Sequence, residues 1–395
     1  MKKYIIILFV GILIFTMALV SVGCTTTTAE TTTAETTTAA TTTAQGKYEY
    51  KPSKWIPEMQ IPMVGPKKIA ILGSWLVEAQ FWLGGVSEME NQGWNWYFQQ
   101  CNGDLATQIS QIDNVIAKGG WDAVFIDSID TGGIVDSIKK LNTAGYPVFC
   151  YDRQPDEGKI EFVSAADHGG TAAKAAENVV QLLTKKNGAP KGKVIAIITS
   201  QEVDSHRVRI EGMREVFAKY PDIEVVEKLI KPDVDSSIST LKSALLAEKN
   251  VDAIWNQVDW YSSGWEQGLK EIDKWYPAGD PKHIIIVSQD GHDFVLKWVK
   301  QGYFDATYDC RIIVWGWGDV WAAAKYFAGE NLKDTVGFKI DSPPFSVDLK
   351  NGVPYSVTGS ILVTKDNCDD PMLWGNMMDK FDAITALLQK GGSTQ

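Results

Sequence analysis

The chain has 395 residues and a formal net charge of −11 at pH 7. This acidic balance argues against a nucleic-acid surface, although it leaves room for a small anionic ligand, because a pocket has its own local charge. Once a leader and a linker are set aside, the length suffices for about two domains.

The first residues have the pattern of a secretory signal. Lysines at positions 2–3 precede an apolar run over 4–20, and small residues then lead to Cys24. A transmembrane anchor is the competing interpretation, but the run is short for spanning a membrane. A cysteine at this place resembles a bacterial lipobox, although Ser21 stands where that box prefers leucine. The resemblance implies a signal peptide over 1–23, a lipidated Cys24 and a body outside the cytoplasm.

A low-complexity segment follows the leader. Residues 25–44 are almost wholly Thr and Ala, and such a composition has too little apolar surface to bury, so it predicts a disordered tether. The stretch 47–66 contains four prolines and is expected to continue the linker or to pack loosely. We therefore assign 24–66 to the tether and expect the folded body to begin near Lys67.

In the body, apolar runs that indicate strands alternate with helical patterns. The first block has predicted strands at 68–72, 94–100, 122–126 and 147–150, with helices at 80–91, 104–118 and 134–142. Strands that are apolar on both faces, each followed by a helix, indicate a parallel sheet covered on both sides.

The same alternation starts again after residue 167. Strands are predicted at 194–199, 223–230, 251–255 and 283–288, and helices at 170–185, 205–220, 236–248, 260–275 and 293–301. Two such blocks predict two similar lobes. A short strand at 306–308, a Trp-rich helix at 312–328 and a strand at 357–364 follow, and are candidates for chain that crosses back between the lobes.

A charged pair ends the fourth strand of the first block. Asp152 and Arg153 stand at its carboxyl end, the end that faces the ligand crevice in open α/β sheets. Because a carboxylate accepts hydroxyl protons and a guanidinium donates through a planar fork, the pair suits a neutral polyhydroxylated ligand. The alternative is a surface ion pair that contributes little.

The order of these motifs resembles the type I periplasmic sugar-binding proteins, the ribose-binding protein family of ABC importers. The motifs are Tyr151-Asp-Arg153, Ala165-Ala-Asp167-His-Gly-Gly-Thr171, Arg207-Val-Arg209-Ile-Glu-Gly-Met213, Ser288-Gln-Asp290-Gly291 and Leu362-Val-Thr-Lys-Asp-Asn367. The resemblance covers Lys67 to about Asn367 and rests on order and spacing, because no single motif is specific.

The resemblance implies two doubly wound, Rossmann-like parallel-sheet lobes joined by a three-crossover hinge, with a sugar bound between them by hinge closure. We place the crossovers near Ala166, Arg311 and Tyr355. The expected N-terminal lobe is 67–166 plus 311–355, and the expected C-terminal lobe is 167–310 plus 356–395.

The resemblance also carries over four polar site residues. Asp152 and Arg153 would hold ring hydroxyls from the first lobe, Arg209 would donate from the second lobe, and Asp290 would accept there. Relatives have Asn-Asp after the strand at 251–255, whereas this chain has Asn256-Gln-Val-Asp259-Trp260. Asp259 keeps the acid and Trp260 could add a stacking face.

An aromatic pair, Phe81 and Trp82, matches the family's first loop and would face the apolar side of a pyranose. Core packing of Trp82 is the alternative, and Glu78 and Gln80 stay equal candidates for a further polar contact. Relatives often offer Gln near the second crossover, where this chain has Asp309-Cys-Arg311. The pocket therefore differs from an orthodox ribose pocket, and the identity of the sugar stays open.

Other conspicuous residues are assigned structural roles. Trp317 and Trp321 lie four apart, so core packing is favoured for the Trp-rich helix over a carbohydrate platform. The four histidines, at 168, 206, 283 and 292, lack metal-ligand spacing. The cysteines Cys101, Cys150, Cys310 and Cys368 have no CxxC spacing and specify no disulfide pairing.

The sequence disfavours an enzyme, because it has no GxSxG elbow, P-loop or complete GxGxxG, and Asp204-Ser-His206 is better explained as a helix start. The signal excludes a repressor of the same fold. We expect a monomeric, membrane-tethered lipoprotein without a cofactor or metal, which binds a pentose or hexose and delivers it to an ABC permease and ATPase. A ligand-sensing receptor, partnered with a chemoreceptor, a sensor kinase or an autoinducer-2 system, is the alternative.

Overall fold

The computed structural model describes residues 47–53, 55–75, 82–199, 201, 203–341 and 344–389. The leader, Cys24, the Thr/Ala-rich stretch and the predicted site residue Phe81, with Glu78 and Gln80, lie outside the described residues. Within the described part, no helix is both long enough and apolar enough to cross a membrane.

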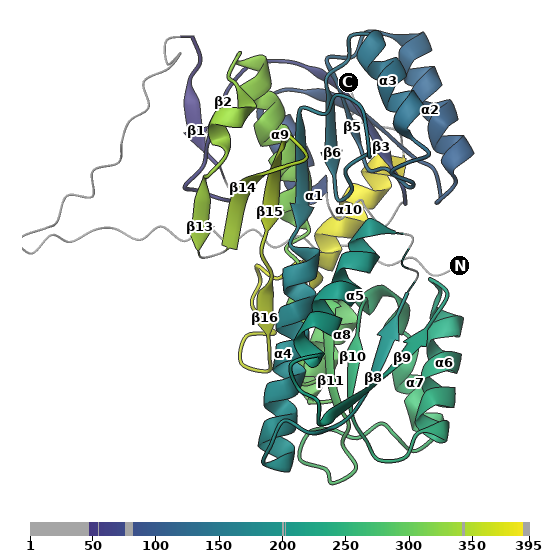
Figure 1. Cartoon of the computed structure of the whole chain (residues 1–395). Coiled ribbons are helices and arrows are strands. Elements are labelled where there is room, and N and C mark those ends of the chain that lie inside the picture. Colours follow the sequence, from purple (N-terminus) through teal and green to yellow (C-terminus); the bar gives the residue numbers. More distant parts are fainter. Residues whose placement is uncertain are drawn as a thin grey trace, which may run out of the picture. The chain divides into compact units, whose positions relative to one another are not determined.

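The first lobe is built on an eight-stranded sheet of order β13-β14-β15-β7-β6-β5-β3-β4 (Figure 1). Its strands are β3 (Lys68–Gly73), β4 (Asn95–Gln100), β5 (Ala123–Ile126), β6 (Val148–Tyr151), β7 (Phe162–Ala166), β13 (Lys339–Asp341), β14 (Pro344–Lys350) and β15 (Val353–Thr358). Its helices are α1 (Trp82–Asn91), α2 (Leu105–Lys118), α3 (Val135–Thr143) and α9 (Ile313–Phe327). One core lies between the sheet and α1 with α9, and another lies between the sheet and α2 with α3.

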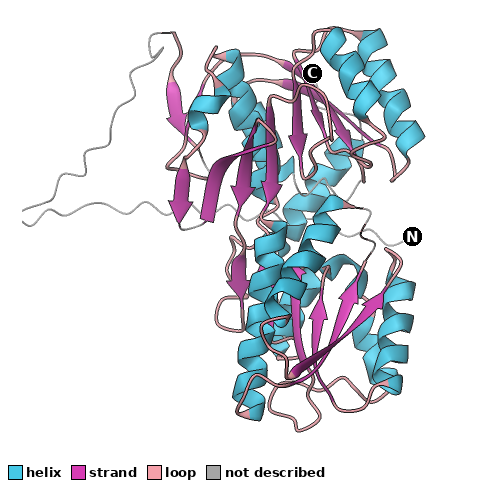
Figure 2. Ribbon diagram, viewed as in Figure 1, coloured by secondary structure: helices cyan, strands magenta, loops and turns pink. Residues whose placement is uncertain are grey.

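The second lobe is built on a six-stranded sheet of order β16-β12-β11-β10-β8-β9. Its strands are β8 (Gly192–Ile198), β9 (Ile223–Leu229), β10 (Val251–Asn256), β11 (Ile285–Asp290), β12 (Ala306–Asp309) and β16 (Ile361–Val363). Its helices are α4 (His168–Asn187), α5 (Asp204–Phe217), α6 (Val234–Ala247), α7 (Trp265–Glu271) and α8 (Asp293–Gln301), with a 3-10 turn, η2, at Asp259–Ser262. Helices cover both faces of each sheet, as Figure 2 shows.

These elements follow from local sequence. Strand β5 is a run of four apolar residues and all four are buried, as expected for a strand in a sheet covered on both faces. Asp104 and Asp167 cap α2 and α4, since their carboxylates accept from the amides of Thr107 and Gly170. The prediction of two doubly wound α/β blocks is confirmed.

The chain passes between the two sheets at three places close to those expected. It leaves the first sheet after Ala166 through α4, returns after Asp309 through α9, and leaves again after Thr358 into β16. In the second lobe, α4 and β16 therefore begin directly after two of the crossovers.

The stretch before Lys67 is part of the folded body, so the expectation of a loosely packed linker was wrong here. Strands β1 (Tyr50–Pro52) and β2 (Gln60–Pro62) pair as an antiparallel hairpin. Ile56, Met59 and Ile61 are at most 2% exposed and belong to the core beside α1 and α9. The prolines at 52 and 62 end their strands, where a missing N–H does least harm to a sheet.

The last part of the chain also differs from the expected boundary. Strand β15 stays in the first sheet as far as Thr358. After the 3-10 turn η4 (Trp374–Met377), helix α10 (Met378–Gln389) buries Phe381 in the first lobe's core, whereas Leu373 lies in a core of the second lobe. Figure 1 shows α10 between the two sheets. The segment 373–381 therefore contacts both lobes, because its apolar side chains are divided between two cores.

Candidate functional site

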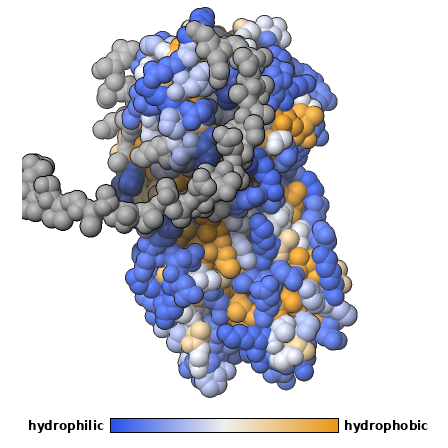
Figure 3. Space-filling model, turned by 90° about the vertical axis from the view of Figure 1, so that its left-hand side faces the viewer, coloured by the Kyte–Doolittle hydropathy of each residue, from blue (hydrophilic) through white to orange (hydrophobic). Residues whose placement is uncertain are grey.

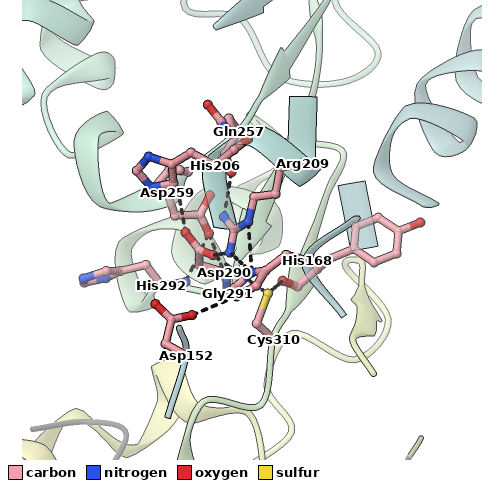
Figure 4. Close-up of polar contacts among 12 residues, drawn as sticks. Asp152, His168, His206, Arg209, Gln257, Asp259, Asp290, Gly291, His292 and Cys310 are labelled. Carbon is pink, nitrogen blue, oxygen red and sulfur yellow. Dashed lines mark hydrogen bonds and ion pairs between the residues drawn. The ribbon is translucent and has the colours of Figure 1, made fainter. Parts of the chain in front are cut away.

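A cluster of charged residues gathers where strands of both sheets end (Figure 4). Asp152 directly follows β6, and Asp290 is the last residue of β11. Both have positive backbone φ, 61° for Asp152 and 110° for Asp290, which is uncommon for residues other than glycine. At both residues the backbone turns away from the direction of the strand. The two carboxylates therefore lie in one cluster.

Arg153 is enclosed by carboxylates. Its Nη2 donates to Asp127 Oδ2 at 2.5 Å and its Nε donates to Asp152 Oδ2 at 3.2 Å, and its side chain is 9% exposed. Asp127 directly follows β5, so the ends of two neighbouring strands hold this guanidinium. Such charge-assisted contacts fix the orientation of the side chain.

His168 connects the two lobes. Its Nε2 lies 2.8 Å from Asp152 Oδ1, and its Nδ1 lies 3.2 Å from Nη2 and 3.3 Å from Nε of Arg209. A guanidinium can only donate, so Nδ1 accepts and Nε2 donates to Asp152. Burial alone would raise the pKa of Asp152, but the hydrogen bond from His168 and the charges of Arg153 and Arg209 lower it below its usual value.

Arg209 is buried and makes further contacts in the second lobe. Its Nη2 donates to Asp290 Oδ1 and its Nη1 donates to the carbonyl oxygen of Gln257, each at 2.8 Å. Burial opposes its charge, yet the nearby carboxylate of Asp290 keeps the pKa of Arg209 above its ordinary value. The structure thus brings together the predicted residues Asp152, Arg209 and Asp290.

Asp259, another predicted site residue, bonds to the turn that follows β11. It is fully buried. Its Oδ2 accepts from the amides of Gly291 at 2.9 Å and His292 at 3.2 Å and from the hydroxyl of Thr307 at 3.1 Å. Burial and the neighbouring charge of Asp290 raise the pKa of Asp259 to about 7. The loop amides draw this carboxylate inward, where it shapes the turn after β11.

The two predicted tryptophans have different surroundings. Trp82 is completely buried, with its ring stacked on Phe125 at 5.6 Å and edge-on to Tyr151 at 5.0 Å, so it packs the core and offers no accessible face. Trp260 is half-buried. Its ring stacks on Trp374 with a centroid distance of 5.6 Å. Trp260 is therefore the predicted aromatic residue with a partly accessible ring.

Histidines at the site were missed by the sequence analysis, which gave all four a structural role. His168, His206 and His292 lie in the cluster, as Figure 4 shows, whereas His283 binds Asp305 at 3.0 Å elsewhere in the second lobe. Burial and the charges of Arg209 and Arg153 lower the pKa of His206 to about 3. One sequence feature could have pointed to His168. It directly follows Asp167, which caps α4, and so stands at the start of a helix that begins beside the crossover.

The Trp-rich helix α9 packs in the core, as the four-residue spacing of its tryptophans favours. Trp315, Trp317 and Trp321 of α9 are at most 3% exposed and pack in the core. The four cysteines of the described part are buried and form no disulfide. Within that part, no group of three or more His, Cys, Asp or Glu has the arrangement of a metal site.

Comparisons with known proteins show which family the chain resembles. A family model described as "Periplasmic binding protein domain" matches residues 79–331. The multiple sugar-binding periplasmic receptor of Rhizobium radiobacter is 24% identical over 237 residues, which cover 56% of this chain and 66% of the relative. The ribose import binding protein of Bacillus subtilis is 23% identical over 226 residues, which cover 57% of this chain and 68% of the relative. These alignments span about two thirds of each relative's own length.

Solved structures of similar fold extend over more of the chain. A solute-binding protein from Bacillus halodurans with bound myo-inositol has a TM-score of 0.64 and 19% identity, and covers 79% of this chain and 99% of its own. One from Agrobacterium vitis with bound α-D-tagatopyranose has a TM-score of 0.64 and 20% identity, and covers 78% of this chain and 97% of its own. At such identities these neighbours establish the two-lobed fold.

Proposed function

This chain belongs to the periplasmic binding protein domain family, and we propose that it is the extracytoplasmic solute-binding component of an ABC sugar importer. In this proposal a neutral monosaccharide or cyclic polyol binds between the lobes and is passed to a permease and its ATPase. Cys24 would be the lipid anchor, and the protein would act as a monomer. The names of the curated relatives and the sugars in similar structures support the class of ligand.

The observation that carries the proposal is the pairing of charges in the cluster. Arg153 is bonded to Asp127 and Asp152, and Arg209 is bonded to Asp290. Because each guanidinium is already compensated, the cluster offers fixed donors and acceptors without a net positive charge. Such a set suits hydroxyl groups better than a phosphate or carboxylate. Asp152, Arg153, Arg209 and Asp290 are therefore the proposed polar contacts, and Trp260 is the proposed aromatic contact.

The proposal places ligand binding and lobe movement in one network. Asp152 belongs to the first lobe and Arg209 to the second, and His168, the first residue of α4, bonds to both. A sugar that bonds to Asp152 and Arg209 would link the lobes and favour closure. On the one face drawn in Figure 3, the apolar residues that the grey atoms leave visible form several patches with hydrophilic residues between them.

The test is a thermal-shift screen of a chain lacking residues 1–44. The panel holds ribose, arabinose, allose, tagatose and myo-inositol, with glucose 6-phosphate and glucuronate as anionic controls. A neutral sugar in large excess over its Kd should raise Tm by several degrees, and the anions should not. A shift with the anions alone would contradict the neutral site, and no shift at all would contradict a sugar-binding role.

The site is tested by titration calorimetry with the sugar that gives the largest shift. Arg209→Ala and Asp290→Ala should each weaken binding by about tenfold or more, because each leaves its partner buried and unpaired. Arg214→Ala is the matched control, since Arg214 lies on the same helix, pairs with Glu227 and has a 45% exposed side chain. Equal affinity in all three variants would refute the site assignment. Uptake of the same sugar by a strain that lacks the protein distinguishes import from sensing. Lost uptake supports a role in import, and unchanged uptake supports a sensing role.

A further inference from the structure

Trp374, near the C-terminal end, reaches the cluster from a distant part of the sequence. It begins η4, is fully buried, and lies 84 positions from Asp290 in the chain. The sequence analysis gave this residue no role.

Trp374 holds the ends of two adjacent strands with hydrogen bonds. Its indole Nε1 donates to the backbone carbonyl oxygen of Asp290 at 2.5 Å, and its backbone amide donates to Asp309 Oδ2 at 3.0 Å. Asp290 and Asp309 are paired residues at the ends of β11 and β12. Since Asp290 adopts a backbone conformation that is uncommon for a residue with a side chain, a donor on its carbonyl fixes the peptide that directs its carboxylate.

The indole ring of Trp374 also supports the aromatic side of the cluster. It stacks on Trp260 with an angle of 18° between the ring planes, and it lies edge-on to His292 at 5.3 Å. His292 in turn contacts Trp260 edge-on at 4.7 Å. Three rings thus hold each other in place, and Trp260 has a rigid layer behind it.

The segment fits closely against the turn that follows Asp290. A Cβ atom at Gly375 would lie 2.4 Å from the carbonyl oxygen of Gly291 and 2.9 Å from the amide nitrogen of Asp293. Real side chains do not approach so closely, so position 375 accepts only glycine without a shift of the turn. Beyond Gly375, Phe381 fixes the segment in the first lobe's core.

We propose that Trp374 is a positioning residue of the ligand site, which sets the Asp290 carboxylate and the Trp260 ring in the arrangement that receives a sugar. This inference rests on the proposed function for its ligand. The physical role does not need the ligand, because the contacts of Trp374 with Asp290, Asp309 and Trp260 are present without one.

The test compares Trp374→Phe with Trp275→Phe in the full chain. Phenylalanine at 374 keeps an aromatic ring but removes the donor to Asp290. Trp275 is the matched control, because it is a buried tryptophan of the second lobe, stacked on Tyr303, and its Nε1 has no hydrogen-bond partner among the described residues. The measurements are the Kd for the best sugar of the panel, Tm, and amide hydrogen exchange without sugar.

Trp374→Phe should weaken sugar binding about five- to tenfold. It should also speed hydrogen exchange at the backbone amides of Asp259, Gly291 and His292. The first of these amides bonds to the carboxylate of Asp290, and the other two bond to that of Asp259. Trp275→Phe should change neither. The inference fails if the two variants lower Tm by the same amount while the Kd for the sugar and the exchange rates of the three amides stay as in the wild type. Trp374 would then be only a core residue.

The two proposals can fail separately. If the wild type binds no sugar of the panel, the proposed function is contradicted, while the exchange of the three amides still decides whether Trp374 positions the turn. If Trp374→Phe does not fold, Phe381→Leu replaces it, because Phe381 lies edge-on to Trp374 at 5.9 Å. A smaller increase in exchange at the same amides is then expected, and unchanged exchange overturns the inference.

Discussion

Single residues differ in how their buried charge is compensated. The guanidinium groups of Arg153 and Arg209 each meet a carboxylate in the cluster. Asp319, in α9, is fully buried, and neither of its carboxylate oxygens has a hydrogen-bond partner among the described residues. Burial raises the pKa of Asp319 well above its ordinary value. The apolar surroundings of this carboxyl group therefore favour its protonated form.

Replacement of this group should stabilise the protein in a pH-dependent way. A raised folded-state pKa means that the folded state keeps a proton which the unfolded state loses above about pH 4, so stability falls as pH rises through that range. Asp319→Asn should match the wild type near pH 3 and be the more stable of the two at pH 7. Urea unfolding at both pH values measures this difference. The exposed Asp366→Asn is the control, and equal stabilities of Asp319→Asn and wild type at pH 7 would count against a neutral Asp319.

The polar residues at strand ends could be located from sequence, but the direction of their side chains could not. Asp152 and Asp290 come together as expected, because each lies at the carboxyl end of a parallel strand, the end that faces the crevice. Arg209 joins them from helix α5. Asp259 also follows a strand, yet the amides of Gly291 and His292 turn it inward. These two amide donors lie more than thirty positions from Asp259 in the sequence. The residues around Asp259 therefore do not predict which way its side chain points.

At the scale of elements, close packing of α4 and α5 places His168 beside Arg209. A Cβ at Gly212 would lie 2.3 Å from the carbonyl oxygen of Gly169, so the two helix backbones are nearly in contact. His168 begins α4 and Arg209 lies three positions before Gly212 on α5. The distance between two helices therefore sets the contact between their functional side chains.

Gly212→Ala should force α4 and α5 apart. We expect a loss of about 1–3 kcal/mol of unfolding free energy, the usual cost of overpacking, together with weaker sugar binding. Gly169→Ala is the control on the opposite helix, since its Cβ would meet Val208 at 3.4 Å, an ordinary contact. Denaturant unfolding measures the loss of stability, and calorimetry measures the sugar affinity. If both variants have the same stability and the same affinity, the close approach of Gly212 to Gly169 does not position the site.

Elements with continuous apolar runs were predictable, whereas those made by distant pairing were not. Strands β3, β5, β8 and β11 lie within a few residues of their expected limits. The hairpin β1–β2 and strands β13 and β14 fall in stretches rich in proline, where local propensity opposes a strand. The helix expected over 260–275 is divided into η2 and α7, with Gly264 packed against Ile238 at the break.

At the scale of the folded body, the segment 373–381 joins cores that belong to different lobes. Leu373 packs in the second lobe, while Met377 and Phe381 pack in the first. Three predicted crossovers were close to the observed ones, but this further connection could not be read from the sequence, because it depends on which core each apolar side chain enters.

Removal of this segment should uncouple the lobes. We expect one calorimetric unfolding transition for the full chain and two for a chain that ends at Thr364, because interlobe contacts are then reduced to the crossovers. A chain that ends at Gln389 is the control and should keep one transition. Two transitions in the full chain would show that the segment does not couple the lobes.

The hairpin β1–β2 is fastened to the first lobe by contacts far apart in the sequence. Its strands are fixed to the first lobe by the Trp321 Nε1 hydrogen bond to the carbonyl oxygen of Gln60, at 3.1 Å, and by a hydrogen bond from Tyr50 to Glu330. Residues 50–62 are therefore part of the first lobe as a moving body. A hinge motion that changes the angle between the lobes would carry this hairpin with the first lobe, and the second lobe would move relative to both.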